Sequence, residues 1–86
     1  MDNKFDTKYI HIYKNIGSNV KRIRNSNNWT QQDLADKCDG VTRAKISKIE
    51  NAYQDYMLST LLEVCNALGK SIEDITREYP KEEITF

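Results

Sequence analysis

The stretch TQQDLADKCDGVTRAKISKIEN, residues 30–51, decides the fold of this chain, because it predicts two short helices joined by a tight turn. Thr30 is a good N-cap residue, and Asp33 stands where a capping box places its acidic partner. Gly40 follows an aspartate and marks a turn, and Thr42 is a second N-cap. The stretch therefore predicts one helix after Thr30 and another after Thr42.

The two predicted helices differ in the faces that they present. Leu34 gives the first helix an apolar anchor, and the small Ala35 allows the second helix to approach closely. Ile46 and Ile49 give the second helix an apolar inner face. The outer face of this helix carries small, polar or basic residues that are suited to DNA: Arg43, Ala44, Lys45, Ser47 and Lys48. Such an arrangement is typical of a helix-turn-helix motif, whose second helix enters the major groove.

Three further helices flank the motif. The first is predicted by apolar residues at three- and four-residue steps: Tyr9, Ile12, Tyr13, Ile16, Val20 and Ile23. A mostly buried helix follows the motif over residues 58–68, with both Leu58 and Leu62 on its apolar side, and stops at Gly69. Ser71 caps a last helix, which Pro80 ends. The chain is therefore predicted to be all-α.

The length of 86 residues fits one compact five-helix domain. We expect this domain to span residues 13–79. Residues 1–12 form either an N-terminal arm or an extension of the first helix, and residues 80–86 form a short C-terminal tail.

The charges are balanced overall, with 13 basic and 13 acidic residues, but they are distributed unevenly. Nine basic and three acidic residues lie between Lys8 and Lys48, whereas three basic and eight acidic residues lie between Ile49 and Phe86. A domain whose two halves carry opposite net charges can turn a basic face toward a polyanion and keep its acidic face away. The distribution fits either a nucleic-acid partner for the first half of the chain or solvated charges that average out in space.

Several classes of protein are excluded by what the sequence lacks. No apolar run approaches a membrane span, and the polar start is no signal peptide, so we expect a cytoplasmic protein without a membrane partner. Cys38, Cys65 and His11 lack the spacing of a metal site. No nucleophile–base set or phosphate loop is present, so we expect no enzyme, no metal and no cofactor.

The order and spacing of these elements resemble those of the Cro/C1-type, or XRE-type, helix-turn-helix regulators. Five stretches carry the resemblance: IGSNVKRIR at 16–24, TQQDLA at 30–35, VTRAKISKIE at 41–50, TLLEVCNALG at 60–69 and SIEDI at 71–75. The resemblance implies a lambda-repressor-like five-helix DNA-binding domain. Three departures stand out: the turn before Gly40 is one residue longer, Ala52 replaces a usual Gly, and Tyr56-Met57 replace a frequent Pro-Ser, so the fourth helix lacks its usual cap.

The resemblance also implies roles for individual residues. Three residues of the second motif helix are expected to contact bases: Arg43, Ala44 and Lys48. Five residues around the motif are expected to contact phosphates: Gln31, Thr42, Lys45, Ser47 and Asn51. An ion pair between Arg24 and Glu50 is expected to tie the first helix to the end of the third.

The function expected from this resemblance is sequence-specific recognition of double-stranded DNA by a transcription regulator, acting as a homodimeric repressor or autoregulator on a two-fold operator. A phage repressor, an antitoxin and a restriction–modification controller protein all remain open, as does a regulatory protein partner. We expect the dimer interface to use apolar residues near the C-terminus: Ile72, Ile75, Tyr79, Ile84 and Phe86. The alternative function is a protein–protein interaction module that docks through the acidic C-terminal half.

Overall fold

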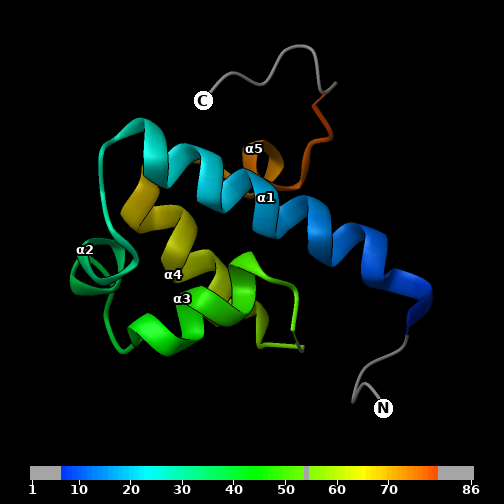
Figure 1. Ribbon diagram of the computed structural model, residues 1–86, viewed down its shortest axis with the longest axis horizontal. Helices are drawn as coiled ribbons and strands as arrows, with labels where there is room; N and C mark the ends of the chain where they lie inside the picture. Colours follow the sequence, from blue (N-terminus) through cyan, green and yellow to red (C-terminus); the bar gives the residue numbers. More distant parts are fainter. Residues whose placement is uncertain (1–6, 54, 80–86) are drawn as a thin grey trace.

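The computed structural model describes residues 7–53 and 55–79, and all of its regular elements are helical. In chain order they are the 3-10 turn η1 (Thr7–Tyr9) and the α-helices α1 (Ile10–Ser26), α2 (Gln31–Asp36), α3 (Arg43–Glu50), α4 (Leu58–Leu68) and α5 (Ile72–Thr76). Figure 1 shows α1 crossing the molecule, with α3 on one side of it and α5 on the other. The predicted all-α fold of five helices is confirmed.

Side-chain caps fix the first residue of three helices. The hydroxyl of Thr30 accepts the backbone N–H of Asp33 at 3.0 Å, and the Asp33 carboxylate accepts the N–H of Thr30 at 2.8 Å. Ser71 and Asp74 form the same reciprocal box at the start of α5, and Thr42 caps α3. These bonds satisfy N–H groups that a helix start leaves without partners, so α2, α3 and α5 begin where they do.

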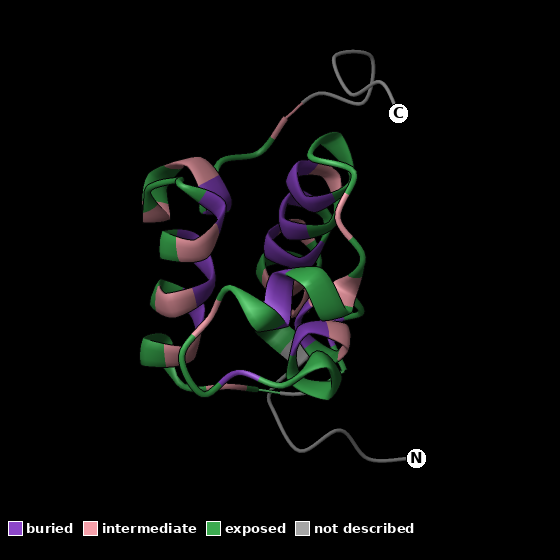
Figure 2. Cartoon of the chain, turned by 90° about the vertical axis from the view of Figure 1, so that its left-hand side faces the viewer, coloured by how far each residue is buried: buried purple, intermediate pink, exposed green. Residues whose placement is uncertain are grey.

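The core lies between the helices, where the buried segments face inward (Figure 2). Among the described residues, the buried members of this core are Ile16, Val20, Ile23, Leu34, Ala35, Val41, Ile46, Ile49, Leu61, Val64, Cys65, Leu68 and Ile75. Helix α1 packs against both α3 and α5, while α2 packs against α3 and α4. None of the described helices has the length and apolar character that a membrane crossing requires.

Tyr9 and Ile12 belong to the predicted stripe of α1, and about half of each is exposed, because the first turns of α1 extend past the core. The expectation that Leu58 and Leu62 lie on a mostly buried side of α4 is wrong. Leu58 and Leu62 are also exposed, at 64% and 45%. The core takes the α4 stripe Leu61–Leu68 instead, and a step of one residue turns Leu62 about 100° away from it.

Helix α5 is shorter than the sequence predicts: it ends at Thr76 and does not continue to Pro80. The side-chain amide of Asn19 is buried and donates to the carbonyls of Ile75 and Arg77 at 2.6 and 2.7 Å. Asn15 donates to the Thr76 carbonyl at 2.7 Å. Two α1 side chains thus satisfy the last carbonyls of α5, and the chain becomes extended at Arg77.

Candidate nucleic-acid interface

Helix α3 presents a polar face to solvent because its apolar face is fixed in the core. Ile46 and Ile49 are fully buried, whereas Arg43, Ala44 and Lys48 are exposed. Thr42 holds the first turn by accepting the N–H of Lys45 at 3.2 Å. The three residues expected to contact bases therefore lie together on the solvent side of one short helix.

A buried ion pair fixes the C-terminal end of α3. The Nε of Arg24 donates to Oε2 of Glu50 at 2.7 Å, and its Nη2 donates to Oε1 at 3.1 Å. The side chains are only 10% and 2% exposed. The Nη1 of Arg24 donates to the carbonyl of Trp29 at 2.6 Å, and Nε2 of Gln31 donates to Glu50 at 3.0 Å. One carboxylate therefore connects α1, α2 and α3 and sets their mutual orientation.

Gly17 allows α1 to approach the same end of α3. A Cβ at this position would lie 2.5 Å from the carbonyl oxygen of Ile49 and 2.6 Å from that of Glu50. Both atoms belong to the backbone of α3, so no side-chain rotation could relieve the clash. The absence of a side chain at Gly17 is therefore required for the observed position of α3.

The connection between α2 and α3 spans residues 37–42 and is held from outside the motif. Gly40 has φ +74°, a conformation that favours glycine, and the Glu63 carboxylate of α4 accepts the backbone N–H of Asp39 at 2.8 Å. Cys38 lies in this turn, because α2 ends at Asp36. Burial raises the pKa of the Cys38 thiol, which makes it a poor nucleophile.

Several of the expected phosphate-binding side chains already have partners in the protein. The amide of Asn51 donates to the carbonyl of Ser47 at 2.8 Å and to its hydroxyl at 3.3 Å. The amide nitrogen of Gln31 carries two protons, of which Glu50 takes one, so the second can be donated elsewhere. The Thr42 hydroxyl accepts within α3 and keeps its own proton for donation.

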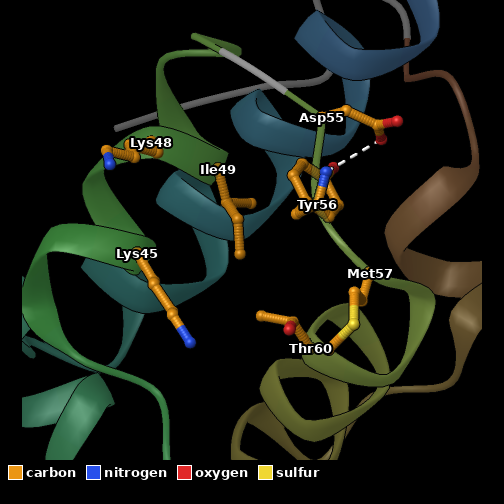
Figure 3. Close-up of a pocket in the computed structure, with 7 residues that line it drawn as sticks. All are labelled: Lys45, Lys48, Ile49, Asp55, Tyr56, Met57 and Thr60. Carbon is orange, nitrogen blue, oxygen red and sulfur yellow. Dashed lines mark hydrogen bonds between the residues drawn. The ribbon is translucent and has the colours of Figure 1, made fainter.

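A pocket of about 240 Å³ lies between α3 and the start of α4 (Figure 3). Lys45 and Lys48 form one wall of it, and Met57 and Thr60 form the opposite wall. The ammonium group of Lys45 extends toward the α4 side, whereas Lys48 points away from it. The connection from α3 to α4 is anchored to α1, because the Tyr13 hydroxyl donates to Asp55 at 2.5 Å.

The expected C-terminal interface residues have different environments. They are Ile72, Ile75, Tyr79, Ile84 and Phe86. Ile75 is fully buried in its own domain and offers no surface to a second copy. Ile72 is half-buried against the core, and Tyr79 stacks under the Arg22 guanidinium at 4.5 Å. Ile84 and Phe86 lie outside the described residues.

Sequence reasoning missed two functional contacts of the motif. It did not foresee that Gln31 binds Glu50, nor that Glu63 binds the turn at Asp39. These partners are 19 and 24 residues apart, and no local pattern marks them. An isolated Asn within an apolar stripe, such as Asn19, was a signal that could have revealed the contact with α5.

Two short helices that are joined by a turn and packed against each other, with a basic face on the second, define a helix-turn-helix protein of the DNA-binding class. The model of the helix-turn-helix family matches residues 20–75 of the chain. Control protein C.SmaI of Serratia marcescens is 33% identical over 79 residues, which are 91% of this chain and 93% of that protein. The chain belongs to the helix-turn-helix family, as a Cro/C1-type DNA-binding transcription regulator.

A solved structure shares the fold. The hypothetical transcription factor NHTF from Neisseria has 25% sequence identity and a TM-score of 0.71, and the match covers 84% of this chain and 79% of that chain. The lambda-repressor-like architecture expected from the sequence thus agrees with both the family match and the structural likeness.

Proposed function

We propose that the protein is a homodimeric regulator that binds a two-fold operator in double-stranded DNA and reads the major groove with residues 43–51. The observation that supports this most is the exposed face of α3, with Arg43, Ala44 and Lys48 outward while Ile46 and Ile49 are buried. A single recognition helix reads only a few base pairs, so two copies are needed for useful affinity and specificity.

The base contacts follow from the chemistry of the exposed face. Arg43 offers two donors that match O6 and N7 of guanine, and the Ala44 methyl can pack against the methyl of thymine. Lys48 lies more than one turn further along α3 and reaches a neighbouring base. Because Arg43 is exposed at the first position of α3, it is the residue best placed to determine sequence preference.

The phosphate contacts fix the position of the protein on DNA without reading sequence. Gln31 and Thr42 each retain a proton for donation, at the starts of α2 and α3. Lys45 supplies a cationic contact to a DNA phosphate. Ser47 and Asn51, near the C-terminal end of α3, contact further phosphates of the DNA. The acidic second half of the chain favours the same orientation, because it is repelled by the DNA.

Among the regulator classes that the sequence leaves open, we propose a controller protein of a restriction–modification system. The support is the likeness to Control protein C.SmaI over nearly the whole of both chains. In this role we expect the protein to act in the cytoplasm as a repressor or autoregulator, without enzymatic activity or a cofactor. Genes for a DNA methyltransferase and a nuclease beside its own gene would support this class, and their absence would contradict it.

The experiment that tests DNA recognition is selection of bound sequences from a random double-stranded pool, followed by titration of the selected site. Arg43→Ala is expected to weaken specific binding by about 1–3 kcal/mol and to relax one base position in each half-site. Lys45→Ala should weaken binding evenly across sequences, since a phosphate contact carries no base information.

Lys70→Ala is the matched control, because Lys70 is exposed between α4 and α5, outside the motif. This variant should leave both affinity and sequence preference close to those of the wild type. An unchanged preference in Arg43→Ala would contradict the assignment of Arg43. If the wild type selects no sequence at all, the protein–protein interaction module becomes the better hypothesis.

A further inference from the structure

The N-terminal ends of α1 and α4, with the residues just before them, carry large apolar side chains that the domain itself does not cover. Five residues make up what we call the α1–α4 face: Tyr9, Ile12, Met57, Leu58 and Leu62, which are 48%, 50%, 69%, 64% and 45% exposed. An open groove of about 320 Å³ runs between the two helices and is lined by Tyr9, Ile12 and Leu58. Exposed apolar side chains grouped around such a groove indicate an interaction site on a soluble protein.

The exposed area of this face matches the central part of a stable interface. At about 200 Å² for each whole side chain, the five residues expose on the order of 500 Å², and a standard interface buries about 800 Å² of each partner. The remainder corresponds to a polar rim, which typical interfaces have. The α1–α4 face is therefore large enough to form the apolar core of a dimer interface.

The face is also adjacent to the DNA-reading helix. Met57 lines the same pocket as Lys48, and the connection from α3 to α4 lies on the same side of the molecule as the start of α1 (Figure 1). By contrast, α5 lies across α1 from α3, so an interface through α5 would be further from the recognition helices.

The size of the molecule agrees with this arrangement. Its Cα atoms extend 34 × 33 × 21 Å, so two copies that meet end to end along the longest axis have their centres about 34 Å apart. Successive major grooves on one side of DNA are about 34–36 Å apart. The chain has no net charge, so long-range repulsion does not oppose the pairing of two copies.

We propose that the α1–α4 face binds the same face of a second copy and forms the two-fold interface of the DNA-binding dimer, an inference that rests on the proposed function. In such an isologous contact the same patch serves both subunits, so each substitution acts twice. Leu58 and Leu62 are one turn apart on α4 and form the centre of the contact, while Tyr9 and Ile12 extend it onto α1.

The test is sedimentation velocity of the full chain over a range of concentrations without DNA. Leu58→Glu and, independently, Ile12→Glu are compared with Ser59→Glu, which adds the same charge to an exposed position on a different side of α4. Burial of an unpaired carboxylate should raise the dimer dissociation constant at least about tenfold for Leu58→Glu and Ile12→Glu, but not for Ser59→Glu. Helical circular dichroism checks that every variant is folded.

The outcomes separate this inference from the proposed function. A wild-type dimer that is weakened by both apolar substitutions and not by Ser59→Glu supports the α1–α4 face. A monomeric wild type, an unchanged dimer in Leu58→Glu, or equal weakening by Ser59→Glu overturns it. Binding of each folded variant to a single half-site of DNA is measured separately. A loss of binding in that measurement would count against the proposed function and not against the interface.

Discussion

Replacement of Arg24 by Met should destabilise the fold more than any surface substitution, because it leaves a buried carboxylate with one partner. Glu50 accepts two hydrogen bonds from Arg24 and one from Gln31, and its side chain is 2% exposed. Removal of one member of a buried pair costs about 3–5 kcal/mol. An 86-residue domain has a free energy of unfolding of about 4–13 kcal/mol, so this loss is a large part of the total. The variant should therefore unfold at a lower denaturant concentration than the wild type.

The double variant Arg24→Met/Glu50→Leu separates the value of the pair from the cost of an orphaned charge. With both charges removed, only the Trp29 carbonyl and the Gln31 amide lose partners, so a loss of about 1–2 kcal/mol remains. The single variant should therefore be less stable than the double variant.

Denaturant unfolding at one fixed protein concentration, followed by the fluorescence of Trp29, measures these differences. Arg43→Met is the matched control and should change stability by less than about 0.5 kcal/mol, because Arg43 is exposed. A loss below about 1 kcal/mol in Arg24→Met, or a double variant less stable than the single one, would refute the reasoning.

The remaining predictions concern three other positions of the fold. Gly17→Ala should lower stability by about 1–3 kcal/mol, because its Cβ would meet the backbone of α3, whereas thermal unfolding of the exposed Ser18→Ala should stay near that of the wild type. The hydrogen bonds from Thr30 lower the pKa of Asp33, so its carboxylate stabilises the fold above its ordinary pKa of about 4 and this contribution disappears as the pH falls further. Asp33→Asn should therefore be less stable than the wild type at pH 7, and urea unfolding should show the difference shrinking in acid; a constant difference would contradict this. Burial raises the pKa of the Cys65 thiol, so its alkylation should be slow in the folded protein and fast in guanidinium, and equal rates would show that the site is open.

Much of the local structure could be predicted from the sequence because it depends on neighbouring residues. The hydroxyls of Thr30, Thr42 and Ser71 accept hydrogen bonds from backbone N–H groups three residues later and so begin helices. These bonds depend only on residues that are close in the sequence. Gly69 ends α4 with φ +70°, a conformation that costs glycine little. Ala52 adopts φ +53° where the family resemblance indicated glycine, so the same turn forms with a strained residue.

The tertiary structure alone decided which apolar residues remain exposed and which polar residues become buried. Leu58 and Leu62 fit the pattern of α4 but lie outside the core, because the rotation of a helix about its own axis depends on the neighbours that it packs against. Asn19 and Glu50 are buried because partners 56 and 26 residues away satisfy them. The sequence by itself determined where the helices begin and that the second motif helix has a basic face. Their mutual arrangement, which places an apolar face beside the DNA-reading helix, depends on contacts between distant residues that no local pattern encodes.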